Sequence, residues 1–327
     1  MNNFPEELES KIISLLQEYN LNHLKEARYS LTDRYRERKE NHKTFMQSNI
    51  ERISYLATRM PATYASISSI VSPMQNLEEF ITCKSLLDVG AGPGTASWCL
   101  ANLIELKEIT LVEKDLELVK LGKSLMKNTK IHILQKATWK VGNIVQENYN
   151  AHDICIASYV LNELSADEQL LLLNKLWLST NKYLILVEPG TSFGFGNILR
   201  ARDFLLSNGA SILAPCTHSK KCPMQESLKW CHFSTRLQRL EMHRMVKGVN
   251  KGFEDEKYSY LILQKNISSY DPLKGRIVGN PQKHSGHLAL EICRDGHLEK
   301  PTITKKHPHY KQIKKLEWGD VVVLEDV

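Results

Sequence analysis

Apolar residues near the start of the chain recur at helical rather than strand spacing. Residues 21–51 are highly charged but keep a helical pattern, and a run interrupted by Pro61 resumes through residue 70. No strand pattern precedes about residue 85. Residues 6–19 show the spacing most clearly, close to a period of about 3.6 residues, at Leu8, Ile12, Ile13, Leu15 and Leu16. The first 80 residues are therefore expected to be helical.

The pattern then changes to short apolar runs that alternate with helical stretches. Strands are expected at 85–89, 108–113, 131–135, 153–158 and 183–188. Helices are expected at about 95–106, 115–127, 166–178 and 190–206. Such alternation is typical of a parallel sheet covered by helices on both faces. A late strand at 257–265 would complete this sheet.

These patterns divide the chain into three expected regions. The first is an N-terminal helical region at 1–80, and the second is an α/β domain at 81–265. The α/β domain carries an insertion at 211–247 that is rich in Cys, His, Lys and Arg. The third is a small β region at 270–327, in which glycine-containing turns separate short strands.

Composition excludes several classes of protein. Hydrophobic residues make up 42% of the chain and charged residues 24%, which is ordinary for a globular protein. No stretch of 18 apolar residues appears, so no membrane partner is expected. The acidic N-terminus lacks the apolar core of a signal peptide and the Arg-rich character of a transit peptide. These features predict either a protein of the bacterial cytoplasm or a mature form of the chain. A monomer is also expected.

The segment Asp88-Val-Gly-Ala-Gly-Pro-Gly94 joins a predicted strand to a predicted helix. Glycines at such a junction let the backbone turn sharply and approach a ligand closely. The dinucleotide fingerprint G-x-G-x-x-G would need Gly or Ala where this chain has Thr95, and a phosphate-binding P-loop would need Gly-Lys-Ser/Thr. The spacing G-x-G-x-G after a strand that ends in Asp instead indicates S-adenosylmethionine. It predicts the Rossmann-like fold of class I S-adenosylmethionine-dependent methyltransferases.

Other polar residues are expected at the same edge of this sheet. Glu113 ends the second strand, where a carboxylate can accept both ribose hydroxyls of an adenosyl group. Ser158 and Asn162 follow the fourth strand, at the edge where open α/β folds bind ligands. The predicted cofactor site therefore comprises Asp88, Gly90, Gly92, Gly94, Glu113, Ser158 and Asn162.

A catalytic residue is much less visible. The chain has no Asn/Asp-Pro-Pro-Tyr motif of amine methyltransferases and no Pro-Cys nucleophile after the fourth strand. Glu188 ends the fifth strand, where it is suited either to act as a general base or to play a structural part. No catalytic residue is assigned.

Four of the seven cysteines suggest a metal site in the second part of the chain. Cys216, Cys222 and Cys231 lie within 16 residues, and Cys293 is distant, so the fold must bring it to the others. Four thiolates suit either structural zinc or an iron–sulfur cluster. The spacing alone leaves both open, with unrelated thiols as a third reading. The other three cysteines lie singly in apolar segments and are expected in the core.

The positive charge is concentrated in the second part of the chain. The whole chain has 43 Lys+Arg and 37 Asp+Glu, a net charge of +6. Residues 190–327 have 22 Lys+Arg and 14 Asp+Glu, or +8, which leaves −2 for residues 1–189. A surface for nucleic acid is therefore sought in the second part.

Taken together, these segments resemble a family of methyltransferase-like proteins associated with the small ribosomal subunit in bacteria and mitochondria. The first half of the resemblance comprises Ser30-Leu-Thr-Asp-Arg-Tyr-Arg36, Tyr55-Leu-Ala-Thr-Arg-Met-Pro-Ala-Thr-Tyr64, the glycine loop through Thr95, and Ser158-Tyr-Val-Leu-Asn-Glu-Leu164. The second half comprises Val187-Glu-Pro-Gly190, Pro215-Cys-Thr-His218, Cys222-Pro223, Trp230-Cys-His-Phe233 and Trp318-Gly-Asp320. The Trp-Cys-His-Phe block, with the cysteines before it, is the most specific part.

The resemblance implies a [4Fe–4S] cluster on Cys216, Cys222, Cys231 and Cys293, and so favours iron over zinc. It also implies binding to small-subunit rRNA during ribosome assembly, with methyl transfer inferred from the fold. The leading hypothesis is an rRNA methyltransferase or a methyltransferase-derived assembly factor. The rival is a non-catalytic rRNA-binding module, and a small-molecule methyltransferase is the weaker third reading.

Basic residues that could contact RNA phosphates form two groups. One flanks the cysteine segment and the other is a lysine run near the C-terminus, interleaved with His307, His309 and Tyr310. The predicted RNA-binding residues are Arg200, Arg202, Lys220, Lys221, Arg236, Arg239, Lys305, Lys306, Lys314 and Lys315. The simpler reading of the lysine run is a solubilising surface.

Overall fold

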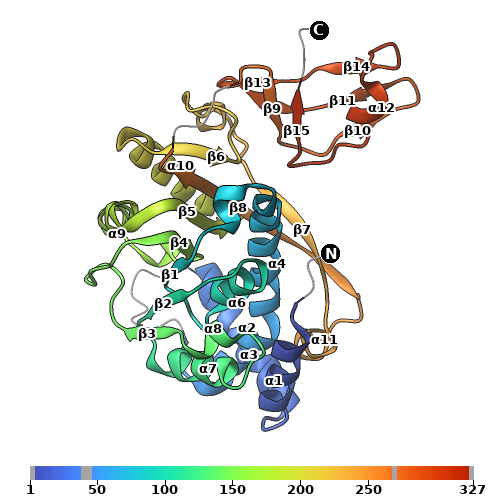
Figure 1. Ribbon diagram of the computed structural model, residues 1–327. Helices are drawn as coiled ribbons and strands as arrows, with labels where there is room; N and C mark the ends of the chain where they lie inside the picture. The colour runs from blue at the N-terminus through green and yellow to red at the C-terminus, as the bar shows by residue number, and fades with distance from the viewer. Residues whose placement is uncertain (1–3, 38–45, 267–270, 324–327) are drawn as a thin grey trace. The chain divides into compact units, whose positions relative to one another are not determined.

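The computed structural model describes residues 4–37, 46–266 and 271–323 (Figure 1). The chain forms two compact units, each made of discontinuous segments. Unit 1 comprises residues 1–146 and 235–256, and unit 2 comprises residues 147–234 and 257–327. These units cut across the three regions expected from the sequence, so that division stays a prediction.

The N-terminal part of unit 1 is helical, as the sequence predicts. Helices α2 and α3 pack against each other, and α1 also contacts α3. Pro61 lies in the first turn of α4, where a missing backbone N–H costs nothing, so it starts a new helix after α3. Residues 38–45 of the charged stretch lie outside the described residues. The helices are α1 (Glu6–Leu16), α2 (Leu21–Glu37), α3 (Asn49–Thr58), α4 (Met60–Val71), η1 (Ser72–Asn76) and α5 (Glu78–Ile81).

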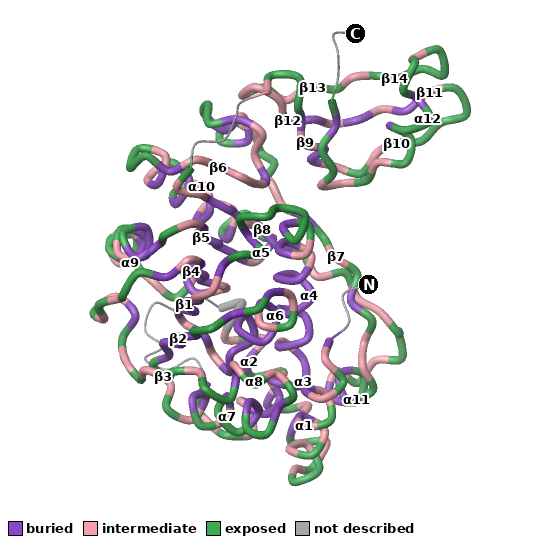
Figure 2. Tube along the Cα trace, in the orientation of Figure 1, coloured by how far each residue is buried: buried purple, intermediate pink, exposed green. Residues whose placement is uncertain are grey.

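Three parallel strands follow in unit 1, in the order β3-β2-β1. They are β1 (Ser85–Val89), β2 (Glu108–Glu113) and β3 (Thr138–Val141). The residues of β1 and β2 are almost all buried (Figure 2), which explains their nearly continuous apolar sequence. The helices that alternate with them are α6 (Thr95–Leu103), α7 (Leu116–Met126) and α8 (His132–Gln135).

The strand predicted at 131–135 is wrong. Four of these residues form the short helix α8, in which only Leu134 is buried, and the third strand lies further along the chain. Trp139 pairs with Leu111 of β2, and a Cβ atom on Gly122 of α7 would lie only 2.4 Å from the Trp139 ring. This long-range packing of one aromatic ring, which no local periodicity records, places β3.

Unit 1 is completed by residues 235–256. These contain most of β7 (Phe233–Gln238), all of α11 (Glu241–Lys247) and the start of β8 (Phe253–Gln264). Helix α11 contacts α2 and α3, and Leu237 packs against two alanines of α4. A segment distant in sequence therefore packs against the N-terminal helices within the same unit.

Unit 2 contains the remaining strands of the α/β pattern. Strand β4 pairs parallel to β5, and β8 pairs antiparallel to both β5 and β6. Helix α9 begins with a capping box between Ser165 and Glu168, as its sequence permits. The predicted strands β4 (His152–Ser158) and β5 (Thr180–Pro189) and the predicted helices α9 (Ala166–Ser179) and α10 (Ser192–Ser207) are confirmed with small shifts in bounds. The structure adds η2 (Leu161–Glu163) and β6 (Ser211–Ala214), which the sequence analysis did not predict.

The C-terminal part of unit 2 consists of short strands, as predicted. Two small sheets have the orders β10-β11-β14 and β13-β12-β9-β15. Ile277, Leu288, Ile292, Ile303 and Val322 are the centre of their shared core. The elements are β9 (Lys274–Ile277), β10 (Gln282–Lys283), β11 (His287–Ala289), β12 (Ile292–Arg294), β13 (His297–Glu299), β14 (Thr302–Thr304), α12 (Tyr310–Ile313) and β15 (Val321–Val323).

The two units together contain the elements of a class I methyltransferase fold. Parallel strands alternate with helices, a glycine loop follows β1, and an antiparallel strand, β8, pairs with β5. The fold class predicted from the sequence is thus confirmed. Over the described ranges, no helix is long and apolar enough to cross a membrane.

Candidate functional site

The glycine loop of unit 1 leaves space on one side of its backbone. It joins β1 to α6, and both Gly92 (φ 55°) and Gly94 (φ 86°) adopt the left-handed conformation that favours glycine. A Cβ atom on Gly94 would collide with Met126, so this glycine permits close packing. A Cβ atom on Gly92 would meet nothing within 4 Å. The loop therefore has open space beside Gly92, where a ligand can approach the main chain.

Asp88 lies at the end of β1 and is fully buried. One carboxylate oxygen, Oδ2, accepts hydrogen bonds from the Ser97 backbone N–H (3.1 Å) and hydroxyl (2.8 Å). Among the described residues the other oxygen, Oδ1, has no hydrogen-bond partner. Burial raises the pKa of Asp88 from 3.8 to about 7, although the Ser97 hydrogen bonds oppose this. A buried acceptor of this kind is suited to a ligand that donates hydrogen bonds.

Glu113 ties the glycine loop to the turn after β2. Its side chain is almost fully buried, and its oxygens accept the backbone N–H groups of Gly92 and Asp115, both at 2.9 Å. An ionised carboxylate has about four acceptor positions. Glu113 therefore links the glycine loop to the turn after β2 through one carboxylate.

In unit 2, polar residues at the end of β5 and in the turn after β4 form a hydrogen-bonded network with α10. Ser158 ends β4 and is half-buried, and Tyr159 follows it with φ 60°. The Asn197 amide, from α10, donates to Asn162 Oδ1 (3.1 Å) and to Glu188 Oε2 (3.5 Å). Asn197 was not predicted, because nothing in its helical sequence context marks it as a site residue. The network positions Asn162 and Glu188 rigidly.

The four cysteines of unit 2 line one cavity of about 30 Å³. Cys216 follows β6, Cys222 precedes the turn η3 (Pro223–Glu226), Cys231 precedes β7, and Cys293 lies in the middle of β12. The fold thus brings the distant Cys293 to the other three, as the sequence analysis required. However, no three His, Cys, Asp or Glu side chains in the described part of the chain are placed to hold a single metal ion.

Burial and mutual proximity keep the thiols of Cys222, Cys231 and Cys293 protonated. Burial raises the pKa of Cys293 to about 12, and neighbouring cysteines contribute to the increase. The pKa values of Cys222 and Cys231 are raised by the same two causes. Since metal ligands must be thiolates, any bound metal would have to displace these protons.

Two arginines, the buried Arg202 and the partly buried Arg276, hold the segments that carry the cysteines. Arg202 donates to the backbone oxygens of His218 (3.3 Å) and Lys220, and Arg276 donates to those of Pro215 (2.6 Å) and Gly319 (2.7 Å). Both guanidinium groups line the same cavity. Spacing along the chain could not have revealed Arg276, which comes beside Cys293 only through pairing of β9 with β12.

His218 adds a polar contact at this cavity. Its Nε2 lies 3.4 Å from Cys293 Sγ, and its other ring nitrogen, Nδ1, is buried without a hydrogen-bond partner among the described residues. Burial lowers the pKa of His218 from 6.5 to about 4, so the ring is neutral at pH 7. The cavity itself is lined by the four thiols, two arginines, Ser259, Tyr260 and otherwise apolar side chains.

The predicted RNA-binding residues differ in exposure. Arg202 is only 3% exposed, which places its guanidinium where no phosphate outside the protein reaches it. Several of the others form ion pairs: Lys220 with Asp295, Lys221 with Glu226, Arg236 with Asp255, and Arg239 with Glu254. Arg200 is exposed and hydrogen-bonds to Gln169 and Asn197. The four lysines of the C-terminal run, Lys305, Lys306, Lys314 and Lys315, are all exposed.

Comparison with known proteins identifies relatives over most of the chain. The family model described as mitochondrial small ribosomal subunit Rsm22 matches residues 49–323. Rsm22-cox11 tandem protein 2, mitochondrial, of Schizosaccharomyces pombe is 27% identical, over 84% of this chain and 43% of that protein. Ribosome assembly protein METTL17, mitochondrial, of Homo sapiens is 24% identical, over 82% of this chain and 61% of that protein. The chain therefore spans about half the length of these relatives.

Among solved structures, a magnesium protoporphyrin IX methyltransferase from Synechocystis with bound S-adenosylhomocysteine is similar. Its TM-score is 0.44 at 14% identity, covering 72% of this chain and 94% of that one.

The sequence relatives are mitochondrial proteins, so the expected location in the bacterial cytoplasm is wrong. The N-terminal composition that suggested it does not decide the compartment.

Proposed function

Because the chain belongs to the Rsm22 family of mitochondrial small-ribosomal-subunit proteins, we propose that it is an S-adenosylmethionine-binding, methyltransferase-like protein acting on or with small-subunit rRNA in ribosome assembly. One observation carries this proposal: the family match spans the open glycine loop, Glu113 and all four cysteines. The human relative is by name a ribosome assembly protein, which supports the same process for this chain.

S-adenosylmethionine would be held mainly by the glycine loop. The open side of Gly92 admits close approach, Glu113 offers acceptors for the ribose hydroxyls, and Asp88 has a buried acceptor that is not yet used. Gly90 and Gly94 shape the turn. For Ser158 and Asn162 of unit 2, contact with the cofactor stays a prediction from the sequence. Calorimetry on protein purified without oxygen tests this. We expect one binding site, and the absence of binding by the wild-type protein would overturn the cofactor assignment.

Methyl transfer to rRNA is the finer proposal, and the bound cofactor would supply the methyl group. The alternative is a non-catalytic assembly factor, and the network around Asn197 favours it, because it occupies the carboxylate of Glu188 with structural hydrogen bonds. Small ribosomal subunits incubated with protein and methyl-labelled cofactor separate the two. Label in the rRNA supports the enzyme, whereas stable co-sedimentation without label supports the assembly factor.

We further propose that Cys216, Cys222, Cys231 and Cys293 bind a [4Fe–4S] cluster, with structural zinc as the alternative. The donor set fits such a group, because four thiols surround one cavity that no carboxylate lines. Arg202 and Arg276 would offset the negative charge of four thiolates. When bound, the cluster would cross-link β12 to the cysteine segments.

Metal analysis of protein purified without oxygen distinguishes these groups. Iron and acid-labile sulfide in equal amounts would support the cluster, whereas stoichiometric zinc without sulfide would overturn it. Because the site does not exist in the unfolded chain, metal affinity contributes to folding. Cys293→Ser should therefore lower the free energy of unfolding by several kcal/mol. Cys83→Ser, which changes a buried cysteine outside the cavity, is the matched control for metal content.

The exposed C-terminal lysines are proposed as the main RNA contact. Their affinity for small-subunit rRNA should fall with salt by roughly one log unit per log salt for each phosphate neutralised. A variant in which four C-terminal lysines are replaced by Glu tests this. Its control is a variant in which four exposed lysines of unit 1 are replaced by Glu. The target set is Lys305, Lys306, Lys314 and Lys315, and the control set is Lys120, Lys123, Lys130 and Lys136. If the target variant co-sediments with small subunits as well as the control variant does, the lysine run is not the RNA site.

A further inference from the structure

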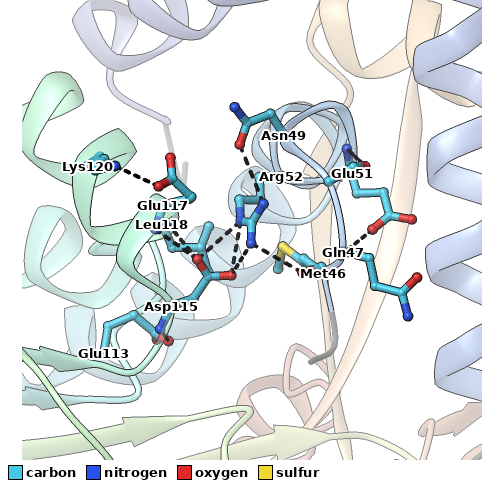
Figure 3. Close-up of polar contacts among 11 residues, drawn as sticks. Met46, Gln47, Asn49, Glu51, Arg52, Glu113, Asp115, Glu117, Leu118 and Lys120 are labelled. Carbon is cyan, nitrogen blue, oxygen red and sulfur yellow. Dashed lines mark hydrogen bonds and ion pairs between the residues drawn. The ribbon is translucent and has the colours of Figure 1, made fainter. Parts of the chain in front are cut away.

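An ion pair joins the N-terminal helices to the turn that follows β2. The guanidinium of Arg52, on α3, is directed at the carboxylate of Asp115 (Figure 3). Nη2 and Nε donate to Oδ2 at 2.7 and 3.0 Å, and Nε lies 3.2 Å from Oδ1. The side chains are only 11% and 17% exposed. This is a charge-assisted contact between residues that lie 63 positions apart, and it is largely protected from solvent.

Asp115 is also linked to the predicted ribose acceptor. Its backbone N–H donates to Glu113 Oε1 at 2.9 Å, and its carboxylate caps α7 by accepting the N–H groups of Glu117 (2.9 Å) and Leu118 (3.2 Å). The orientation of Asp115 therefore decides where one oxygen of Glu113 lies. Arg52 in turn fixes the carboxylate of Asp115.

Arg52 is itself held in place by the segment before α3. Its Nη2 donates to the backbone oxygen of Met46 (3.3 Å), and Met46 packs in an apolar cluster with Leu31 and Leu118. Glu51 accepts the Gln47 backbone N–H at 2.6 Å and pairs with Arg34. The segment 46–52 thus has a defined conformation beside the turn that follows β2.

We propose that Arg52 is a positioning residue of the cofactor site. By holding Asp115, it sets the Glu113 carboxylate in the orientation that accepts the ribose hydroxyls of the cofactor. This inference rests on the proposed function, in which the glycine loop and Glu113 bind S-adenosylmethionine. On this proposal, the N-terminal helices contribute to cofactor binding through Arg52 on α3.

The experiment measures recognition of the ribose hydroxyls, not binding alone. Calorimetry gives the dissociation constants of S-adenosylhomocysteine and of its 2′-deoxyribose analogue for each variant. Arg52→Gln should weaken S-adenosylhomocysteine binding about tenfold, roughly one hydrogen bond to a charged group, and change the analogue much less. Arg52→Lys should recover part of the preference. Lys120→Gln removes an exposed ion pair with Glu117 on the same helix and should change neither constant.

A second variant guards against loss of folding. Asp115→Asn keeps an acceptor for the α7 cap but weakens the pair with Arg52, so it should lose the ribose preference as Arg52→Gln does. If these variants lose affinity equally for S-adenosylhomocysteine and for its 2′-deoxyribose analogue, the pair only stabilises the fold and the inference is overturned. It is also overturned if the variants keep the wild-type preference for S-adenosylhomocysteine over the analogue. If the wild-type protein bound neither ligand, the cofactor assignment itself would fail.

Discussion

Glu188 provides the most quantitative test of the buried polar network in unit 2. It is completely buried at the end of β5, with Oε1 accepting the Leu161 backbone N–H at 2.9 Å. Oε2 accepts a long hydrogen bond from the Asn197 amide at 3.5 Å. Burial raises the pKa of Glu188 from 4.5 to about 8, more than these hydrogen bonds lower it. The folded protein therefore prefers the protonated carboxyl group.

The sign of the pH dependence follows from proton binding. Between pH 4.5 and about 8, the folded state keeps the Glu188 proton that the unfolded chain has lost. Stability therefore falls as pH rises through this window, by about 1.4 kcal/mol per pH unit. The whole window amounts to on the order of 4–5 kcal/mol. Above pH 8 this contribution is constant.

Replacement of Glu188 by Gln removes the ionisation and keeps most of the shape. The variant should lose about 1 kcal/mol at pH 5, because an amide replaces the group that contacts Asn197. At pH 8 and above it should be more stable than the wild type by several kcal/mol, since no buried carboxylate ionises. The two stability curves should cross between these pH values.

Urea unfolding at a series of pH values from 5 to 9 measures both curves. Glu105→Gln is the matched control, because its side chain is 85% exposed and this variant should follow the wild type. If the wild-type and Glu188→Gln curves run parallel across the window, the carboxyl group does not titrate there. The reasoning about its buried environment would then be refuted.

The remaining predictions concern the loop, the cavity and a buried ion cluster. Gly92→Val should cost about 1–2 kcal/mol from its positive φ and abolish S-adenosylmethionine binding in calorimetry, whereas Gly209→Val, with φ 81° and equal open space, should cost as much and leave binding intact. Arg276→Met should lower stability in urea by about 1–3 kcal/mol for each carbonyl left without a donor, and it should speed proteolysis at residues 215–222. Glu254 is partly buried, which alone would raise its pKa, but hydrogen bonds from His243, Lys247 and Arg239 lower the pKa overall. Glu254→Gln should therefore cost about 3–5 kcal/mol at pH 7, and the loss should shrink as pH falls below 4.5.

Local patterns in the sequence determined much of the fold. The alternation of apolar strands and helices identifies β1, β2, β4 and β5 within a few residues, because strands buried on both faces need continuous apolar runs. The G-x-G-x-G spacing identifies the loop after β1, because only glycine combines positive φ with open space at Gly92. Helical periodicity likewise identifies the N-terminal helices. Each of these signals lies within one short segment.

Contacts between distant segments were decided only by the tertiary structure. Packing of Trp139 on Gly122 placed β3, whereas the apolar residues of 131–135 formed a short helix. Arg202 counts in the sequence as one more basic residue, yet the fold buries its guanidinium against backbone carbonyls. Arg52 meets Asp115 across 63 residues, and no spacing rule relates the two. Sequence periodicity reports which face of an element is buried, but the partner on that face depends on how all the elements pack.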